Sequence, residues 1–427
     1  MGSGKRIAVI GAGPVGLEAA LEARRLGHDA AVYEAGRVGE HFRRYGDVVL
    51  FTPFRMNSTE NGRARLAASG VPLPPPEALL AAADLAALYL EPLSRLPELR
   101  GTVREGARVT GIAREGFRKP DGIAASGDSP RSGRPFLLGV EERGATRFER
   151  ADVVIDASGV YGNACATGPG GLPSPGEERL GDRIERHLPS IRGASRPRYA
   201  GRRVLLVGDG YSAATALVDL AALAAEPGVG ASSGAPRVHW VHRGTPGDPY
   251  PADANDPLPS RRGLAERANA AARAGGWLVR HPGATILGYD EAPGGAVRVT
   301  LRGPEGVEGA IEVDRVLALV GYRPDSALSR ELHLHLCYAS EAPMALASAL
   351  LAAQAHDPGA SPDCLSQVPH GPASLKTAEP DFFVIGAKSY GRGSNFLLTV
   401  GHEQVRDVMR LIGPAAERRS AAPMPAR

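Results

Sequence analysis

Two glycine-rich segments, about two hundred residues apart, have the spacing of loops that bind phosphate groups. The first, Gly11-Ala12-Gly13-Pro14-Val15-Gly16, follows a β-branched run from Arg6 to Ile10 and precedes an Ala- and Leu-rich stretch that ends near Leu26. In such a loop the first glycine permits a tight turn, the second lets backbone approach a pyrophosphate, and the third packs helix against strand. The helix then points its N-terminus at the phosphates. We therefore expect Gly11, Gly13, Pro14 and Gly16 to bind a dinucleotide.

An acidic residue follows this segment at the place where a nucleotide-binding unit needs one. The residues from Asp29 to Tyr33 are typical of a second strand, and Glu34 ends it. A carboxylate there can accept hydrogen bonds from the ribose hydroxyls of an adenosine. A glycine turn alone could be purely structural. The order of strand, glycines, helix, strand and acid favours nucleotide binding.

The second segment, Gly208-Asp209-Gly210-Tyr211-Ser212-Ala213, also lies between a predicted strand, at 202–207, and a predicted helix through Leu223. Alanine at the third position still allows close helix packing. The next predicted strand, from Arg237 to Val241, ends in His242-Arg243-Gly244 without an acid. A guanidinium there can pair with a 2′-phosphate, so NADPH is expected rather than NADH. The predicted contacts are Gly208, Gly210, Tyr211, Ser212, Ala213, His242 and Arg243, although Arg243 could also be a solvated arginine at a strand end.

The elements that position these loops indicate an α/β protein. Short β-branched runs alternate with Ala- and Leu-rich stretches, which is typical of parallel sheets covered by helices. A chain of 427 residues, 43% of them hydrophobic, most naturally forms two or three domains. The strand-glycine-helix unit occurs twice, so two Rossmann-like domains are expected.

The composition argues against several other classes of protein. The net charge is only +3, with Lys and Arg spread along the chain, so neither nucleic acid nor an anionic membrane is expected as a partner. Cys165, Cys337 and Cys364 lie far apart, which argues against a metal site, a disulfide scaffold and a dithiol relay. No signal-peptide pattern opens the chain, and Gly, Pro and Glu18 interrupt the apolar stretch at 7–23. The expected protein is cytoplasmic and binds small molecules; a homodimer is left open.

With both motifs in place, the chain resembles the two-dinucleotide-binding-domain flavoproteins of the flavin-containing monooxygenase-like and thioredoxin reductase-like superfamily. The segment from Asp152 to Gly159 is similar to the strand and turn by which those chains leave their FAD domain. The segment from Asp314 to Asp325 is similar to the one by which they return to it. The resemblance implies an NADPH-binding domain inserted into an FAD-binding domain, with Ala157 and Gly159 near the FAD. The predicted boundaries are 1–165 and 320–413 for the FAD domain, 166–319 for the NADPH domain, and 414–427 for a flexible tail.

The C-terminal part extends the resemblance. Residues 381–386 read as the last strand of the FAD domain, and 387–395 lead into a helix that ends near Ile412. In the family this helix points its N-terminus at the flavin, where its dipole would stabilise negative charge. The resemblance implies FAD contacts from Gly386, Lys388, Ser389 and Asn395. The chain departs from the family at Ala387, where many relatives have Asp, and it lacks both the class B monooxygenase fingerprint and the redox cysteine pair of thioredoxin reductases.

Two polar clusters supply candidate catalytic residues. The first contains Asn57, which could donate to a flavin C4a-peroxide, and Arg55, which could steer nicotinamide or substrate. The alternative is equally good: Asn57 only holds the backbone of its own loop, and Arg55 is a surface residue. The second contains Cys364 and His370, six residues apart, which could meet over a flavin with His370 moving protons. Lone buried cysteines are usually inert.

The function that the resemblance implies is an NADPH-dependent flavin monooxygenase. NADPH would reduce the flavin, O2 would form a C4a-(hydro)peroxyflavin, and this species would oxygenate a small-molecule substrate. One alternative is an NADPH-dependent reductase or oxidase for a small disulfide, a quinone or O2. A second alternative is a non-catalytic redox sensor that uses bound flavin.

Overall fold

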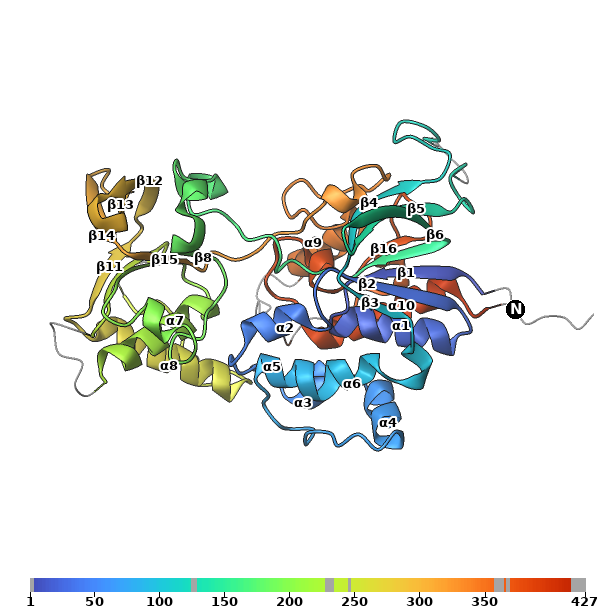
Figure 1. Cartoon of the computed structure of the whole chain (residues 1–427), viewed down its shortest axis with the longest axis horizontal. Helices are drawn as coiled ribbons and strands as arrows, with labels where there is room; N and C mark the ends of the chain where they lie inside the picture. Colours follow the sequence, from blue (N-terminus) through green and yellow to red (C-terminus); the bar gives the residue numbers. More distant parts are fainter. Residues whose placement is uncertain are drawn as a thin grey trace, which may run out of the picture.

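The computed structural model describes residues 4–123, 129–226, 234–244, 247–356, 365 and 369–415. It contains two lobes, each built on a five-stranded parallel sheet (Figure 1). The sheet of the first lobe has the order β16-β7-β1-β2-β3. Its strands are β1 (Arg6–Ile10), β2 (Asp29–Glu34), β3 (Val103–Glu105), β7 (Val153–Asp156) and β16 (Phe382–Val384).

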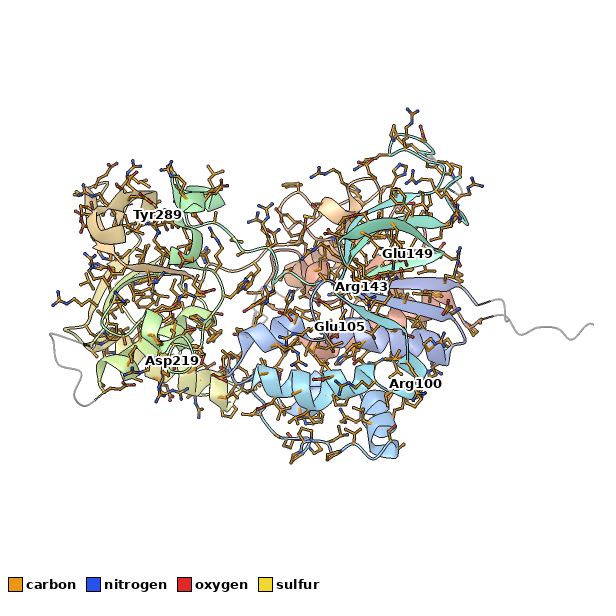
Figure 2. The ribbon with its side chains drawn as sticks, viewed as in Figure 1. Arg100, Glu105, Arg143, Glu149, Asp219 and Tyr289 are labelled. Carbon is orange, nitrogen blue, oxygen red and sulfur yellow. The ribbon has the colours of Figure 1, made fainter. Side chains whose placement is uncertain are left out.

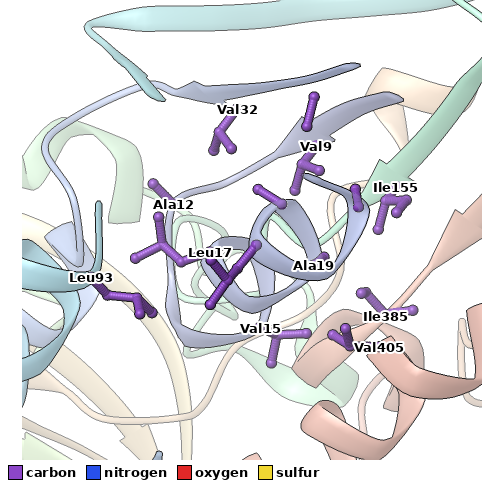
Figure 3. Close-up of a cluster of buried hydrophobic side chains, with 14 of the residues drawn as sticks. Val9, Ala12, Val15, Leu17, Ala19, Val32, Leu93, Ile155, Ile385 and Val405 are labelled. Carbon is purple, nitrogen blue, oxygen red and sulfur yellow. The ribbon is translucent and has the colours of Figure 1, made fainter. Parts of the chain in front are cut away.

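Helices cover one face of this sheet. Figure 3 shows α1 between Val9 and Ile155 of the sheet and Ile385 and Val405 toward α10. The alanines and leucines of α1 are buried, whereas its charged residues, apart from Glu18, lie in its last turn. The helices of the lobe are α1 (Pro14–Arg25), α2 (Glu40–Tyr45), α3 (Phe54–Asn57), α4 (Glu60–Ala68), α5 (Ala82–Leu85), the π-helix η1 (Ala86–Leu90), α6 (Glu91–Ser94), α9 (Met344–His356) and α10 (Leu398–Ile412).

An antiparallel sheet covers the other face. It consists of β4 (Ala107–Arg114), β5 (Phe136–Glu142) and β6 (Ala145–Ala151), and Glu149 in Figure 2 marks β6. Alternate side chains of β5, including Phe136 and Leu138, pack against Val154 and Phe382 of the parallel sheet. The parallel strands are therefore buried on both faces, as their β-branched sequences require.

The second lobe repeats this arrangement. Its parallel sheet has the order β11-β10-β9-β15-β8, with α7 (Tyr211–Ala224) and α8 (Pro259–Arg273) on one face. An antiparallel sheet, which carries Tyr289 in Figure 2, packs on the other face. The strands are β8 (Ile184–Glu185), β9 (Arg203–Val207), β10 (Arg237–His242), β11 (Leu278–Pro282), β12 (Thr285–Ala292), β13 (Ala296–Arg302), β14 (Glu308–Val313) and β15 (Arg315–Ala318).

Short 3₁₀ turns complete the described chain: η2 (Pro97–Leu99), η3 (Pro169–Gly171), η4 (Glu177–Arg183), η5 (Arg196–Arg198), η6 (Pro293–Gly295), η7 (Ala327–Ser329), η9 (Pro372–Leu375) and η10 (Gly386–Tyr390). None of the helices in the described ranges is long and apolar enough to cross a membrane.

Two chain crossings connect the lobes. The chain leaves the first lobe after β7 and returns after β15, and the two crossings pair where Cys165 N donates to Gly321 O at 2.9 Å. Because β16 completes the first sheet near the C-terminus, the second lobe is an insertion into the first. The predicted fold class, α/β with one Rossmann-like domain inserted into another, is confirmed. The residue boundaries at 165/166 and 319/320 stay predictions.

Candidate functional site

The first glycine loop has the geometry of a phosphate cradle. Gly11 has a φ of +99°, and a Cβ added there would lie 2.7 Å from the carbonyl oxygen of Ala157. A Cβ added at Gly16 would lie 2.0 Å from the carbonyl oxygen of Gly11. These two glycines are needed for packing. A Cβ at Gly13 would meet no described heavy atom within 4 Å, and no side chain caps the N-terminus of α1 there. Open space and free amides coincide where a pyrophosphate would approach.

Glu34 is fixed beside this loop. Its carboxylate accepts hydrogen bonds from the backbone N–H groups of Ala12 and Gly36, both at 2.8 Å. Burial raises the pKa of this carboxyl, and the two hydrogen bonds oppose that shift. Each carboxylate oxygen keeps a further lone pair for a ribose hydroxyl. Pro14 occupies the first turn of α1, where its missing N–H costs nothing.

The turn after β16 is tied to the end of β7 by a buried ion pair. Lys388 Nζ lies 2.6 Å from Asp156 Oδ2 and donates to Ser158 Oγ at 3.1 Å. Ala157 lies between these partners, and Gly159 follows with a φ of +70°. The Lys388 ammonium therefore has a carboxylate partner within the protein. If Lys388 also contacts a flavin, as predicted, its ammonium group would interact with both the flavin and Asp156. The sequence did not indicate the ion pair with Asp156.

Helix α10 holds the same turn from the other side. Gly386 N donates to Gln404 Oε1 at 2.8 Å, and Gln404 Nε2 donates to Ser389 Oγ at 2.9 Å. Ser389 in turn donates to the carbonyl of Gly386. Asn395 is half-buried just before α10. The segment predicted to contact FAD is therefore one hydrogen-bonded unit with α10, and Gln404 is a member of it that the sequence did not single out.

In the second glycine loop, as in the first, some positions are closely packed and one faces open space. Gly208 has a φ of +125°, and a Cβ there would lie 2.2 Å from the carbonyl oxygen of Leu319. Ala213, in the third position, is fully buried against the sheet. A Cβ at Gly210 would meet no described heavy atom within 4 Å, and α7 begins at the next residue, Tyr211, without a side-chain cap. Open space beside an uncapped helix N-terminus thus occurs a second time.

The residues predicted to bind a 2′-phosphate differ sharply from each other. The Arg243 side chain is 92% exposed, and its Nη2 atom lies 3.3 Å from Asp209 Oδ1 in the glycine loop. His242 is only 2% exposed and packs on Trp240 with ring centroids 4.2 Å apart. Burial lowers the pKa of His242 to about 4. A buried, neutral imidazole offers a phosphate no charge, so the structure favours Arg243 and not His242 for this contact.

The first lobe reaches the second glycine loop through residues that sequence reasoning missed. The Phe51 ring packs edge-on against Tyr211, with centroids 5.3 Å apart. The Tyr45 hydroxyl hydrogen-bonds Ser212, and burial raises the pKa of Tyr45. Tyr45, Val48 and Phe51 all pack on the core of the second lobe. Tyr211 and Ser212 therefore lie at the junction of the lobes, which only the folded chain reveals.

Four aromatic rings fill the crossing between the lobes: His41, Tyr161, His187 and Tyr322, here named the hinge aromatic cluster. Tyr161 stacks on His187 with centroids 4.4 Å apart and lies 4.7 Å from Tyr322. His187 Nδ1 lies 3.1 Å from the Tyr322 hydroxyl. Burial lowers the pKa of His41 to about 4 and also lowers that of His187. All four residues are half-buried, and both imidazoles are neutral at physiological pH.

The structure gives the predicted catalytic residues local partners. Asn57 is buried, its amide donates to the carbonyls of Thr52 and Pro53, and its Oδ1 accepts from Thr52 Oγ1. It holds its own loop, which was the alternative interpretation. Arg55 is exposed and pairs with Glu77 at 2.6 Å.

The second catalytic pair is described only in part. His370 is half-buried, and burial lowers its pKa. Cys364 lies outside the described residues. Whether these two residues meet therefore stays a prediction.

Comparisons with known proteins agree with this architecture. No model of a protein family matches the chain, and no curated protein does. Among solved structures, the bacillithiol disulfide reductase Bdr from Bacillus cereus superposes with a TM-score of 0.65, at 18% identity over 96% of this chain and 98% of that one. The ornithine N-hydroxylase of Kutzneria sp. 744 gives 0.60 at 16% identity over 96% and 99%. The fold is that of the two-dinucleotide-domain flavoproteins.

A third solved structure of the same fold is that of a flavin-containing monooxygenase. The flavin-containing monooxygenase from Stenotrophomonas maltophilia superposes with a TM-score of 0.55, at 17% identity over 96% of this chain and 100% of that one. At such identities the likeness establishes the flavoprotein fold over nearly the whole chain. The resemblance expected from the two glycine motifs is confirmed at that level.

Proposed function

We propose that this chain is an FAD-dependent, NADPH-consuming oxidoreductase, with FAD on the first glycine loop and NADPH on the second. The observation that carries the proposal is the pair of openings at Gly13 and Gly210, each beside an uncapped helix N-terminus. In both loops the neighbouring glycine or alanine positions are filled by packing. A loop that served only as a turn would not need an open glycine at the same place twice.

The residues present fit both cofactors. Glu34 would bind the FAD ribose, and the first turn of α1 would bind its pyrophosphate. The first turn of α7 would bind the NADPH pyrophosphate, and Arg243 its 2′-phosphate. Tyr45 and Phe51 bring the first lobe against that same turn. The N-terminus of α10 would face the flavin ring, where its dipole favours negative charge.

The finer proposal is a monooxygenase that uses O2 on a small-molecule substrate. Bound FAD would supply hydride acceptance and oxygen activation. The hinge aromatic cluster would pack the junction of the lobes, and the helix N-termini would stabilise negative charge with amide groups that are already oriented. In support, several proteins of the same fold are N-hydroxylases or flavin monooxygenases, and one was solved with reduced FAD, NADP+ and L-ornithine.

A reductase for a small disulfide, a quinone or O2 is the second candidate. The likeness to the bacillithiol disulfide reductase and to thioredoxin reductases favours it. Against the disulfide form, Cys165 and Cys337 are unpaired free thiols in the part of the chain that the structure describes. No sequence-adjacent pair of cysteines exists to relay electrons.

Isotope labelling separates these candidates. The purified protein would be incubated with NADPH, ¹⁸O2 and a panel of amines, sulfides and ketones, and the products analysed by mass spectrometry. A monooxygenase places one ¹⁸O atom in a product and consumes more than one equivalent of NADPH per FAD only when O2 is present. Anaerobic NADPH oxidation driven by a disulfide or quinone, without labelled product, would instead support the reductase. Failure to bind FAD and NADPH at all would overturn both.

A further inference from the structure

A cavity of about 760 Å³ lies between α1, α4 and α10, in the half of the molecule that carries the N-terminus (Figure 1). Its walls run along α1 from Glu18 to Leu26 and along α10 from His402 to Gly413. Most of this lining comes from the C-terminal parts of the two helices, but Glu18 and His402 lie only one turn beyond the glycine loop and the first turn of α10. None of the residues proposed to bind FAD or NADPH lines the cavity. Its volume is in the range of small-molecule sites.

The inner end of the cavity carries two buried polar side chains. Glu18 is 2% exposed, and Tyr89 donates its hydroxyl hydrogen to Glu18 Oε1. His402 is 5% exposed, and its Nε2 atom has no hydrogen-bond partner among the residues that the structure describes. Buried polar atoms are almost always paired, and an unpaired one needs an explanation. Because both side chains line the same cavity, a ligand there would supply the missing partner.

The charges around the cavity decide which ligand fits. The arginines at its rim are each paired with an acidic neighbour: Arg25 with Glu22 at 2.7 Å, Arg406 with Glu403 at 3.2 Å, and Arg410 with Asp407 at 2.7 Å. Glu18, by contrast, belongs to no ion pair within the described ranges. A carboxyl group without a basic partner is completed by a cation, whereas an anion would find every rim guanidinium already neutralised.

The other residues that line the cavity indicate which chemical group the cation carries. Leu26, Val405 and Met409 contribute apolar surface, while Thr59 adds a hydroxyl group near Glu18. Burial lowers the pKa of His402 to about 3, so its imidazole is neutral and offers one ring nitrogen as an acceptor. Carboxylate, imidazole and hydroxyl acceptors at one end, with hydrocarbon beyond them, match an ammonium group on an alkyl or aryl chain.

We propose that this cavity is a second binding site, which takes a primary or secondary amine with an apolar body. The ammonium group lies between Glu18 and His402, and its hydrocarbon chain lies against Val405 and Met409. This ligand would contact none of the residues proposed to bind FAD or NADPH. The proposal can therefore be tested whether or not those two sites are correct.

Calorimetric titration of the whole protein with n-hexylammonium, n-hexanol and hexanoate tests this site. Wild type binds the ammonium at least tenfold more tightly than the alcohol and does not bind the carboxylate. Glu18→Gln, which keeps an acceptor for Tyr89, weakens the ammonium at least tenfold, and His402→Phe weakens it severalfold. Glu60→Gln, at the exposed rim, is the matched control and leaves the affinity within twofold.

The pH dependence gives a second readout. Burial raises the pKa of Glu18 to about 7, with Tyr89 from η1, Glu22 from its own helix and Arg63 from α4 also acting on it. Arg406 and Arg63 face His402. The ammonium affinity should therefore rise between pH 6 and 8 in wild type as Glu18 ionises, and stay level in Glu18→Gln.

Three outcomes overturn the proposal. They are no binding of the ammonium by wild type, equal binding of ammonium and alcohol, and a Glu18→Gln variant that is folded, by its melting temperature, yet binds like wild type. An ¹⁵N spectrum of the His402 ring locates the ligand directly, because its Nε2 shift moves only if the ammonium reaches it.

Discussion

At the scale of single residues, the openings at Gly13 and Gly210 are the features on which the proposed function depends most directly. We expect Gly13→Val to abolish FAD binding while the fold survives, because the added side chain fills free space and touches no described atom of the protein. The measurement is the flavin absorbance per protein after purification. Retention of stoichiometric FAD would remove the assignment of this loop.

A control for that change is available on the second lobe. Gly309 on β14 also has no described heavy atom within 4 Å of an added Cβ, and its φ is not positive. Gly309→Val should therefore leave both the flavin content and the melting temperature near those of wild type. If Gly309→Val loses FAD as well, the loss reports general damage and not a blocked cradle.

We expect Arg243 to decide the choice of coenzyme. Because its guanidinium is exposed just after β10, where it pairs with Asp209 of the glycine loop, Arg243→Ala should weaken NADPH binding by roughly ten- to a hundredfold. NADH should change by no more than a few fold. Binding of both coenzymes is measured on wild type, Arg243→Ala and the control Arg237→Ala, which lies at the exposed start of the same strand. Equal weakening of both coenzymes would make Arg243 a structural residue.

The sequence located the two glycine loops, but it did not show how the polar residues around them are held. A glycine is required by local backbone geometry, which a motif encodes directly. The environment of Lys388 depends on a side chain distant in sequence, because Asp156 lies more than two hundred residues away. The partners of Asn57 and His242 are local: Asn57 bonds Thr52 and Pro53, and Trp240 packs on His242 from the same strand. Residue types alone do not show that these local contacts bury both side chains.

At the scale of elements, the Lys388–Asp156 ion pair fixes the turn after β16 to the end of β7. Both side chains are at least 95% buried, so removing one partner leaves an uncompensated charge. We expect Lys388→Met to lower the free energy of unfolding by about 3–5 kcal/mol, measured in urea. The double variant Lys388→Met with Asp156→Asn should recover much of that loss.

An exposed pair on the same lobe is the control for this prediction. Lys5 Nζ lies 3.3 Å from Asp381 Oδ1, with the lysine side chain 41% exposed. Lys5→Met should cost no more than about 1 kcal/mol, because water screens the pair. A Lys388→Met variant as stable as Lys5→Met would show that the buried pair contributes little to holding the turn.

The parallel strands and long helices were predictable from sequence, but the layers around them were not. The β-branched runs at 6–10 and 203–207 are strands as expected, followed by the expected helices. The two antiparallel sheets on the far faces were not predicted, although β4 and β13 alternate buried and exposed positions; β6 is largely exposed and gives no such pattern. Residues 54–57, expected as a polar cluster in a loop, form a short helix.

At the scale of the whole molecule, the two lobes repeat one plan of helices, parallel sheet and antiparallel sheet. The insertion places the carboxyl end of β7 and the return from β15 side by side at the crossing. The repeated motif predicted two such domains, and the family resemblance implied that one is inserted into the other. The contacts of Tyr45, Phe51 and the hinge aromatic cluster arise only when both lobes are folded, so no single segment could reveal them.

The response of the molecule to pH is set partly by two buried groups on the first lobe that act in opposite directions. Burial lowers the pKa of His402 to about 3 from an ordinary 6.5, so its contribution to stability is present above 6.5 and is lost as the pH falls toward 3. Burial raises the pKa of Glu18 to about 7 from an ordinary 4.5, so its contribution is present below 4.5 and is lost as the pH rises through 7. Between pH 4.5 and 6.5 the two slopes oppose each other.

Single substitutions should therefore change the pH dependence with opposite signs. Each group contributes about 1.4 kcal/mol per pH unit within its window. In His402→Gln the free energy of unfolding should fall with rising pH, relative to wild type, by about that amount per unit between pH 4.5 and 6.5. In Glu18→Gln it should rise by a similar amount, and the double variant should regain the wild-type slope. Urea unfolding at half-unit steps of pH measures all four proteins. If both single variants keep the wild-type slope, these two groups titrate in the folded protein as they do in the unfolded chain, and their burial has no effect on protonation.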